Sequence, residues 1–435
     1  MLKTLKNAWG IEELRKKILF TLFIILVYRL GNAVPVPYVN TTMLESYFNT
    51  VNNTILGLWN TMSGGSFSMA TIFALSIQPY INASIIIQLL TIAIPALERL
   101  QKEGGEEGRK KIASITRYTT VGIGLIMGFA YYMLIKNGVN GQSMLTSDGV
   151  GVWPAIVIIM TFMAGSALIM WMGEQVTEFG VGNGISIILF ASIIARFPSS
   201  IGTMITNVSN GSLAWWALAL VILGALAIIV LIVIVNDAER RIPVQYSKRV
   251  VGRKLYGGQS THLPMKVNMS GVLPVIFAQS IASLPITVWT FIGIPTKEES
   301  PVAYAIYNAI DTKSIIYMVV YFIMIIGFSY FYSSIQFNPV EIANNLKKQG
   351  GFIPGFRPGK PTVDFIRKVL NKITLFGAIY LGIVAICPLI VGKIVGNDHL
   401  AIGGTSVIIV VGVALETVKA LESQMLMRQY KGFLE

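Results

Sequence analysis

The chain has 435 residues, of which 54% are hydrophobic and only 13% are charged, and its mean hydropathy is +0.65. A soluble domain carries about 25% charged residues, so this composition excludes an ordinary soluble enzyme and a disordered chain. The 34 basic residues exceed the 21 acidic ones, which gives a formal net charge of +13. The single cysteine, Cys387, excludes an intramolecular disulfide and lies in an apolar run, where we expect it to pack in the core.

Ten apolar runs along the chain are each long enough to cross the hydrocarbon core of a bilayer, which takes roughly 20 helical residues. An even number of spans places both ends of the chain on the same side of the membrane. The fifth run is the least regular, because Arg196 and Pro198 shorten its apolar stretch. The expected spans are residues 18–36, 80–97, 112–134, 152–172, 184–201, 213–235, 272–294, 315–335, 373–391 and 400–415.

The distribution of Lys and Arg orients these spans. Most of the 34 basic residues lie in the N-terminal segment, in alternate connections (99–117, 240–266 and 347–372) and in the C-terminal tail. Because cytoplasmic loops hold the excess of Lys and Arg, we predict that both termini are cytoplasmic. The first run also resembles a cleavable signal peptide, but the mixed-charge segment before it and the nine later spans favour an uncleaved helix.

Ten spans divide into two halves of five, residues 1–200 and 201–435. An odd number of spans per half reverses the orientation of the second half, so any internal repeat is inverted. Inverted-repeat membrane proteins often place their pathway between the halves, at segments interrupted by proline or glycine. Pro79 interrupts the second apolar stretch, and Pro274 and Pro285 interrupt the seventh, although proline is also simply commoner in membrane helices. The predicted fold class is an all-α polytopic membrane protein with ten transmembrane helices in two inverted five-helix halves.

A segment before the second span, residues 56–73, is too apolar for a solvated loop, and the run SGGS at its centre interrupts it too much to span a membrane. Irregular backbone is tolerated at membrane depth only where protein buries it or where it lines a cavity. We therefore predict a re-entrant or plugging segment near residues 57–70. The alternative is an interfacial helix on the outer surface, anchored by Trp59.

Two predicted cytoplasmic loops, 236–271 and 336–372, are longer than connectors need to be, and each carries seven basic and two acidic residues. In the first, the extended segments IPVQYSKRV and LPMKVN suggest a β-hairpin. In the second, Asn338 is placed to cap a helix that ends at a Gly-Gly pair, and Thr362 is placed to cap another.

The segment between these two helices, GGFIPGFRPGKP, places glycine and proline on both sides of Arg357. This pattern predicts a stiff turn that holds the guanidinium away from the bilayer. Arg357 is then either part of a docking surface or a charge that only sets the topology. Both loops are basic, which suits a partner with an acidic face or ribosomal RNA.

No arrangement of residues for catalysis, metal binding or energy conversion is recognisable. The segment 355–360 approaches a phosphate-binding loop, but a proline stands where the first glycine belongs and another follows the lysine. The two histidines, His262 and His399, lie far apart on opposite predicted sides, which disfavours zinc. We predict no enzyme activity, no catalytic residue, no metal site and no cofactor, so any use of ATP belongs to a partner.

The interrupted spans carry isoleucine beside small polar residues instead of a charge at mid-membrane. Ion-coupled transporters usually keep an ionisable side chain near mid-membrane. In this sequence no ionisable residue lies at the centre of a predicted span. Ile81 and Ile85 share a helix face through their spacing of four, and Ile276 lies in the seventh span. Such a stripe is either ordinary core or lipid contact, or a hydrophobic constriction that excludes ions by dewetting.

At these residues the chain resembles the SecY family, the channel-forming subunits of the Sec protein-export machinery. The resemblance runs essentially from end to end, and long, unusual motifs in a matching order and spacing carry it. These motifs are IQPYINASIIIQLL from Ile77, WMGEQVTEFGVGNGIS from Trp171, QSTHLPMKVN from Gln259, IPGFRPG from Ile353 and GGTS from Gly403.

The resemblance implies a clamshell of two five-helix halves, with an hourglass pore between them and a lateral gate between spans two and three and spans seven and eight. It implies a protein-conducting channel that recognises signal sequences, translocates unfolded secretory polypeptides and releases membrane proteins laterally into the plasma membrane. It also implies a pore ring in which Leu189 replaces the family's commoner isoleucine. The ring residues are Ile81, Ile85, Ile185, Leu189, Ile276 and either Ile408 or Ile409.

Three further sets of residues follow from the same resemblance. The plug falls on about residues 58–69 and includes Leu58, Trp59, Met62, Gly64, Gly65 and Phe67. The polar positions of the lateral gate are Ser84, Gln88, Gln279 and Ser283. The surface that docks the ribosome or the motor ATPase SecA contains Arg241, Lys248, Arg249 and Arg357.

The partners implied by the resemblance are the small membrane subunits SecE and SecG, SecA, the ribosome, signal sequences and unfolded secretory polypeptides, in the lipid bilayer of a bacterial plasma membrane. The main rival hypothesis is an inverted-repeat secondary transporter for a small hydrophobic or peptide solute, which the missing mid-membrane charge and the large basic loops disfavour. An intramembrane hydrolase lacks a catalytic set within the spans, and a structural scaffold leaves the plug-like segment unexplained.

Overall fold

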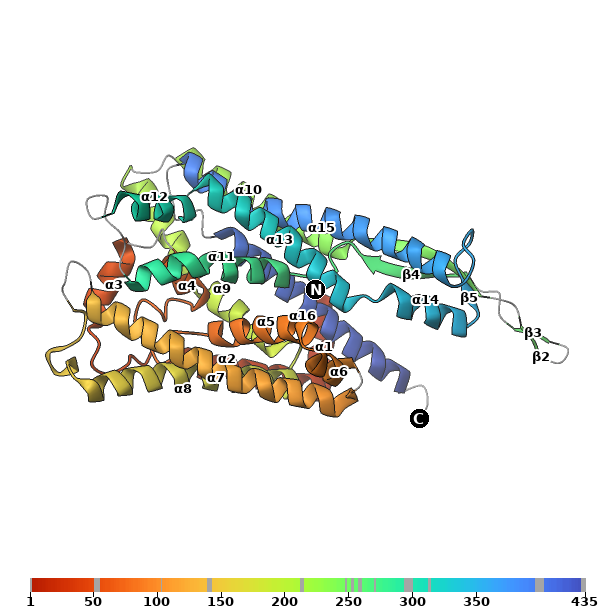
Figure 1. The fold of residues 1–435 in the computed structure, drawn as a ribbon, viewed down its shortest axis with the longest axis horizontal. Coiled ribbons are helices and arrows are strands. Elements are labelled where there is room, and N and C mark those ends of the chain that lie inside the picture. The colour runs from red at the N-terminus through yellow and green to blue at the C-terminus, as the bar shows by residue number, and fades with distance from the viewer. Residues whose placement is uncertain are drawn as a thin grey trace.

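The computed structural model of the protein describes residues 2–50, 55–102, 104–138, 143–211, 215–246, 249–251, 254–256, 260–269, 271–292, 300–311, 314–395 and 403–431. These residues form an elongated bundle of helices, most of which run along its long axis (Figure 1). Short strands gather at one end of the bundle (Figure 1).

Helices dominate the secondary structure. Those of the N-terminal half are α1 (Leu2–Gly10), α2 (Glu12–Gly31), α3 (Thr41–Thr50), α4 (Ile55–Met62), α5 (Gln78–Ala93), α6 (Pro95–Lys102), α7 (Gly105–Asn137), the 3-10 turn η1 (Ser147–Gly149), α8 (Val152–Phe179) and α9 (Gly184–Ser209). Those of the C-terminal half are α10 (Trp215–Asp237), α11 (Leu273–Ile292), α12 (Pro301–Ile310), α13 (Ile315–Gln336), α14 (Pro339–Lys348), α15 (Lys360–Val395) and α16 (Gly403–Lys431). The strands are β1 (Glu239–Tyr246), β2 (Arg249–Val251), β3 (Lys254–Tyr256), β4 (Ser260–Lys266) and β5 (Gly351–Phe352).

Each of the ten apolar runs falls on a helix, namely α2, α5, α7, α8, α9, α10, α11, α13, α15 and α16. Within the described residues, five helical stretches are by themselves long and apolar enough to cross a membrane: Gly105–Asn137, Val152–Phe179, Gly184–Thr206, Ile315–Lys348 and Lys360–Ile390. A sixth is added when α5 and α6 are counted as one broken span. The described apolar stretches of α10 and α11, Ile222–Asp237 and Leu273–Ala282, are shorter.

The second and fifth spans differ from their predicted ranges. The second does not run straight to residue 97, because α5 ends at Ala93 and α6 leaves it at an angle of 105°. At the bend, Ile94 adopts an extended conformation (φ −108°, ψ 112°), as a residue before proline prefers. The fifth span is longer than predicted, because α9 continues through Pro198 to Ser209.

The two halves of the chain lie on opposite sides of α16. In Figure 1, α2, α5, α7 and α8 lie on one side, and α10, α13 and α15 lie on the other. Within the halves, α7 packs against α5 and α8, and α13 packs against α11 and α15. Between the halves, α16 packs against α9, and α11 contacts both α7 and α4. One apolar core passes through both halves.

The two long basic loops meet in one small sheet. Strand β1 pairs with β4 in antiparallel register, with Gln245 opposite Ser260, which confirms the predicted hairpin. The same strand pairs on its other edge with β5, where Gln245 lies opposite Phe352. The sequence did not predict this second pairing, which joins loops that are far apart in the chain. Strands β2 and β3 form a separate two-stranded ribbon.

The sheet has its own apolar core, shared with α14 and the first turns of α15. We call β1, β4, β5, α14 and these turns the sheet unit. Its buried core residues are Ile242, Val244, Met265, Ala343, Leu346, Ile353, Ile366 and Leu370. This core is a separate apolar cluster from the one that runs through the membrane helices.

The helix caps of the second loop agree only in part with prediction. The side-chain oxygen of Asn338 accepts a hydrogen bond from the Val340 N–H at 3.1 Å, which confirms the predicted cap of α14. Thr362 does not cap α15, because that helix already begins at Lys360. The Thr362 hydroxyl instead donates to the carbonyl oxygen of Arg357 at 2.8 Å, and this bond fixes the turn to the helix.

Candidate functional site

The apolar residues expected at a constriction come from four helices of the two halves. Six of them are buried in the shared core: Ile81 and Ile85 on α5, Leu189 on α9, Ile276 on α11, and Ile408 and Ile409 on α16. The side chain of Ile185, on α9, is partly buried and packs against this core. Because Ile408 and Ile409 are only 1% and 2% exposed, burial does not single out one of them. Residues that lie far apart in the sequence thus contribute to a single apolar core between the halves.

The expected plug begins with the short helix α4, which contacts α9 in one half and α11 in the other. The side chains of Met62 and Phe67 are 4% and 2% exposed, and Trp59 packs against the shared core. The side chain of Leu58 lies outside the described residues. This burial argues against an interfacial helix resting on the outer surface. We call residues 55–77 the plug segment.

Short polar side chains of the plug segment bond its own irregular backbone. The N–H of Ser68 donates to the side-chain oxygen of Asn60 at 3.0 Å, and the N–H of Phe67 donates to the hydroxyl of Ser63 at 3.1 Å. Backbone polar groups at membrane depth must be satisfied by protein, and these bonds do so locally.

Left-handed backbone is concentrated in the same segment. Gly64 and Gly65 have φ of 71° and 92°, a region that glycine enters at little cost. Ala70 and Ser76 also have positive φ, of 44° and 49°, where a Cβ atom makes the conformation unfavourable. Non-glycine strain of this kind persists only where the surrounding structure holds it, and it is common at switches.

An aromatic group holds the middle of the plug segment against α7. The ring of Phe67 stacks on that of Tyr131 with centroids 4.3 Å apart and planes inclined by 15°. The Tyr131 hydroxyl donates to the carbonyl oxygen of Phe67. The edges of Phe48 and Trp59 meet the same phenyl ring at centroid distances of 5.3 and 5.9 Å. Sequence reasoning missed Tyr131, since a tyrosine within an apolar span carries no signal of its partner.

The polar residues expected at the lateral gate occupy two places. Ser84 and Gln88 on α5 line a cavity of about 190 Å³ whose other walls come from α6, α7 and α8. Gln279 on α11 is 8% exposed, and the side chain of Ser283 lies outside the described residues. The first pair therefore faces helices of its own half at this cavity.

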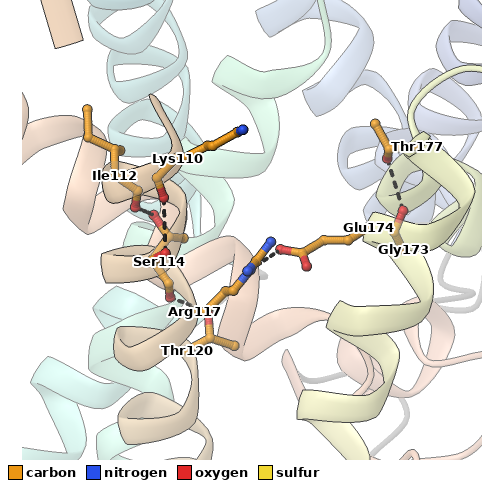
Figure 2. A network of polar contacts seen from close by, with 9 residues as sticks. Lys110, Ile112, Ser114, Arg117, Thr120, Gly173, Glu174 and Thr177 are labelled. Atoms are coloured by element: carbon orange, nitrogen blue, oxygen red, sulfur yellow. Dashed lines mark hydrogen bonds and ion pairs between the residues drawn. The ribbon is translucent and has the colours of Figure 1, made fainter. Parts of the chain in front are cut away.

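An ion pair joins α7 and α8, and Figure 2 shows its two side chains. It lies beside the cavity, because Glu174 is also a lining residue. The Arg117 Nε donates to the Glu174 Oε1 at 2.8 Å, and the two side chains are 51% and 26% exposed. One turn further along α8, the Thr177 hydroxyl donates to the Gly173 carbonyl oxygen and accepts from the Gly184 N–H, each at 2.9 Å. These bonds tie the start of α9 to α8 at the end of the bundle that carries the basic connections.

The basic residues expected to dock a partner lie on or beside the sheet unit. Arg241 is exposed on β1, 4.0 Å from Glu239, and Arg357 is exposed in the turn between β5 and α15. Gly355 and Gly359 on either side of this turn have φ of 86° and 112°, which supports the predicted stiff projection. Of the other two, Lys248 and the side chain of Arg249 lie outside the described residues.

Metal ligands are not gathered in the part of the chain that the structure describes. There, no group of three or more His, Cys, Asp or Glu side chains is placed to hold a metal ion. His262 lies on β4, and His399 falls outside the described residues.

Comparison with known proteins identifies this arrangement. A family model described as SecY matches residues 71–418. The chain is 43% identical to the protein translocase subunit SecY of Streptomyces scabiei, over the whole length of both chains. It is 41% identical to the same subunit of Thermus thermophilus, covering 100% of this chain and 98% of that one.

Solved structures agree at the level of the fold. A structure titled "The structure of a protein conducting channel" matches with a TM-score of 0.64 at 17% identity, covering 94% of this chain and 92% of the other. Sec61 in a canine ribosome-channel complex matches with a TM-score of 0.60 at 16% identity, over the same shares of the chains. The chain belongs to the SecY family. It is an all-α polytopic membrane protein with the ten transmembrane helices, in two inverted halves, of that family's fold.

Proposed function

We propose that this chain is the protein-conducting channel of a translocase. It passes unfolded secretory polypeptides across the membrane and releases membrane proteins sideways into the lipid. The observation that carries the proposal is full-length identity of more than 40% to protein translocase subunits SecY, together with the fold of a protein-conducting channel. These comparisons do not favour the alternative of a secondary transporter. The family is one of channel subunits, and catalysis belongs to a motor partner.

The constriction and the plug segment supply a physical basis for a closed state. Apolar side chains contributed by both halves at the membrane centre exclude ions, because a narrow apolar passage does not hold water. The plug segment contacts α9 and α11 and so bridges the two halves. In this proposal Ile81, Ile85 and Ile276 are constriction residues, and Ser84, Gln88, Gln279 and Ser283 border the lateral gate.

Signal sequences open the channel through differential binding, since a ligand shifts an equilibrium only by that difference. Moving a channel from 1:99 to 99:1 in favour of the open state requires about 5.5 kcal/mol. An apolar stretch of roughly ten residues, at about 0.3–0.6 kcal/mol each, supplies about 3–6 kcal/mol on entering lipid through the gate. A polar segment supplies none, so hydrophobicity is the feature that the channel recognises.

The partners and orientation follow from charge. Both termini and the sheet unit face the cytoplasm, because the basic connections lie at that end of the bundle. The exposed Arg241 and Arg357 make that end a docking surface for the ribosome or for SecA. Two structural neighbours are ribosome complexes, Sec61 in a canine ribosome-channel complex and a yeast Ssh1 complex bound to the 80S ribosome, which supports the ribosome as a partner. SecE and SecG complete the complex in the plasma membrane.

The constriction is tested by exchanging Ile85 and Ile276 together for serine. Both side chains are buried, at 4% and 7% exposure, and hydroxyl groups at these positions hydrate the passage. We expect vesicles carrying the variant to leak small ions without any substrate, as measured by release of an entrapped dye. Ile86→Ser is the matched control, because Ile86 is 42% exposed on the outer face of the same helix. Ion-tight double-variant vesicles would remove these residues from the constriction.

The docking surface is tested by Arg357→Glu in inverted membrane vesicles. We expect motor-driven export to be blocked, while membrane insertion of a simple hydrophobic protein continues. Lys368→Glu makes the same charge change at an exposed position on α15 and leaves export unchanged. Normal export by Arg357→Glu would reduce this residue to a topology-setting charge.

A further inference from the structure

The cavity beside Ser84 and Gln88 has walls of unusual chemistry. Its lining includes Ser84, Gln88, Thr91, Gln101, Thr116 and Glu174, and Glu174 is the charged residue of the lining. Glu174 gives the cavity wall a negative charge at the end of the bundle that carries the basic connections. Because the Glu174 side chain is 26% exposed and Gln101 is exposed, the cavity opens to solvent.

Several polar groups around the cavity present acceptor lone pairs, although the hydroxyls of Tyr80 and Ser84 and the amides of Gln88 and Gln101 can also donate. The Thr91 hydroxyl donates to the carbonyl oxygen of Gln88 at 2.7 Å, and the Thr116 hydroxyl donates to that of Ile112 at 2.9 Å. Each hydroxyl has then used its one proton and can only accept from a ligand. The side-chain oxygen of Gln88 is buried and has no hydrogen-bond partner. A carboxylate, an amide oxygen and two hydroxyl oxygens with remaining lone pairs form a site for a group that only donates, such as an ammonium or a guanidinium.

The internal partner of Glu174 is easily exchanged. Arg117 binds it at 2.8 Å from outside the cavity wall, and the arginine side chain is 51% exposed. Ion pairs this exposed contribute little, about 0–1 kcal/mol, because each charge is also well solvated when they separate. A second cation that enters the cavity can therefore replace Arg117 at Glu174, while Arg117 turns into water. Figure 2 shows the guanidinium reaching from α7 to the carboxylate on α8.

We propose that this cavity is a subsite for the basic n-region of a signal sequence. A signal sequence places a positively charged n-region immediately before its apolar h-region. In the proposed channel the h-region enters lipid at the lateral gate, and α11 contacts α7 there. The cavity lies on the α5 and α8 side of that same α7 helix. A Lys or Arg of the n-region then binds Glu174 and the Gln88 oxygen in exchange for Arg117. The inference rests on the proposed channel function and adds recognition of charge to recognition of hydrophobicity.

The test measures export of two precursors by inverted vesicles that carry the full chain with its partner subunits. One precursor has two Lys residues in its n-region, and the other has Gln at the same positions. The readout is the ratio of their initial export rates. We expect Glu174→Gln to lower this ratio about three- to tenfold, the effect of losing one partly exposed charge-assisted contact. We expect Arg117→Gln to raise it, because Glu174 then has no internal competitor.

The two substitutions are expected to change the export ratio in opposite directions, which distinguishes a ligand subsite from an ion pair that only holds two helices together. If the ion pair only held α7 and α8 together, both substitutions would change the two export rates equally and leave the ratio constant. That result would overturn the proposal. Glu178→Gln, an equal charge change at an exposed position one turn along α8, is expected to leave the ratio unchanged. If wild-type vesicles exported neither precursor, the channel function itself would fail, and this inference with it.

Discussion

The sheet unit and the plug segment are both compact substructures set against membrane helices, but they are stabilised differently. The sheet unit projects at one end of the bundle (Figure 1) and has its own core, in which Met265 and Ile366 are fully buried. In water, burial of apolar surface supplies the stabilisation, at about 25 cal/mol per Å². The sheet unit can therefore keep its shape whatever the arrangement of the membrane helices.

The plug segment has no separate core. Its apolar side chains join the core shared by both halves, whereas Asn60 and Ser63 bond its backbone from within. Ala70 and Ser76 add strain of order 1–3 kcal/mol each, which leaving the site would relieve. A segment that carries its own hydrogen bonds can move without leaving many unpaired polar groups behind. The plug segment is therefore suited to moving out of the passage when the channel opens. The sheet unit is suited to a docking surface of fixed shape.

Each substructure packs its backbone closely against one membrane helix at a glycine of that helix. A Cβ atom on Gly165 of α8 would lie 1.9 Å from the carbonyl oxygen of Ile72, in the plug segment. A Cβ atom on Gly377 of α15 would lie 2.7 Å from the carbonyl oxygen of Val267, directly after β4. Close backbone approach to a helix is thus common to both. The source of internal stability is what distinguishes them.

Removing the anchor of the plug segment should give the largest effect. Phe67→Ala deletes a ring that is 2% exposed and stacked on Tyr131, at a cost of about 3–5 kcal/mol. A closed-to-open ratio of 99:1 corresponds to only about 2.7 kcal/mol, half of the roughly 5.5 kcal/mol that reverses the ratio, so this loss is large enough to open the channel. We expect ion leakage without a signal peptide, measured as conductance in a planar bilayer. Met69→Ala, at a position 46% exposed in the same segment, should stay tight. A closed Phe67→Ala channel would contradict the anchor.

Destabilising the core of the sheet unit should not open the channel. Ile366→Ala creates a cavity at a fully buried position between α15 and the sheet and costs the unit about 2–5 kcal/mol. We expect faster proteolysis of the two basic loops and weaker binding of the motor or ribosome, with unchanged ion conductance. Val340→Ala, on the exposed face of α14, is the control. Ion leakage from Ile366→Ala would show that the two substructures are not independent.

Breaking the ion pair at the base of the sheet unit should have the smallest effect. Lys419 Nζ on α16 lies 2.6 Å from Asp237 Oδ1 at the end of α10, with side chains 42% and 51% exposed. Asp237→Asn should lower the free energy of unfolding by only about 0.2–1 kcal/mol, because solvent screens exposed charges. Thermal unfolding in detergent at low and high salt measures this, and high salt should shrink the difference. A loss of several kcal/mol would mean that this ion pair holds α10 and α16 together more strongly than its exposure implies.

Hydropathy and local capping predicted most of the architecture. Each of the ten apolar runs located a helix, and the Asn338–Pro339 pair located α14. The bend after Ala93 carried a local signal in Pro95, but the continuous apolar run concealed it. Helix α9 passes through Pro198, an exposed position, although proline in a helix interior usually breaks or kinks the helix.

Contacts between distant segments could not be predicted. Strand β5 has two residues and pairs with a loop about a hundred positions earlier, so no local pattern announces it. The same holds for Tyr131 against Phe67 and for the cavity beside Gln88, since each depends on how separate helices face one another. The isoleucine stripe of the interrupted spans pointed to Ile81, Ile85 and Ile276, whereas the remaining constriction residues and the gate came from family resemblance. The roles of all these residues stay predictions.

Conductance of the purified channel complex in a planar bilayer, before and after a synthetic signal peptide is added, tests the central claim most directly. The account predicts a silent bilayer that opens with the hydrophobic peptide and stays silent with a peptide whose apolar stretch is made polar. Silence under both conditions, together with gradient-driven uptake of a small solute, would contradict the channel and favour a transporter.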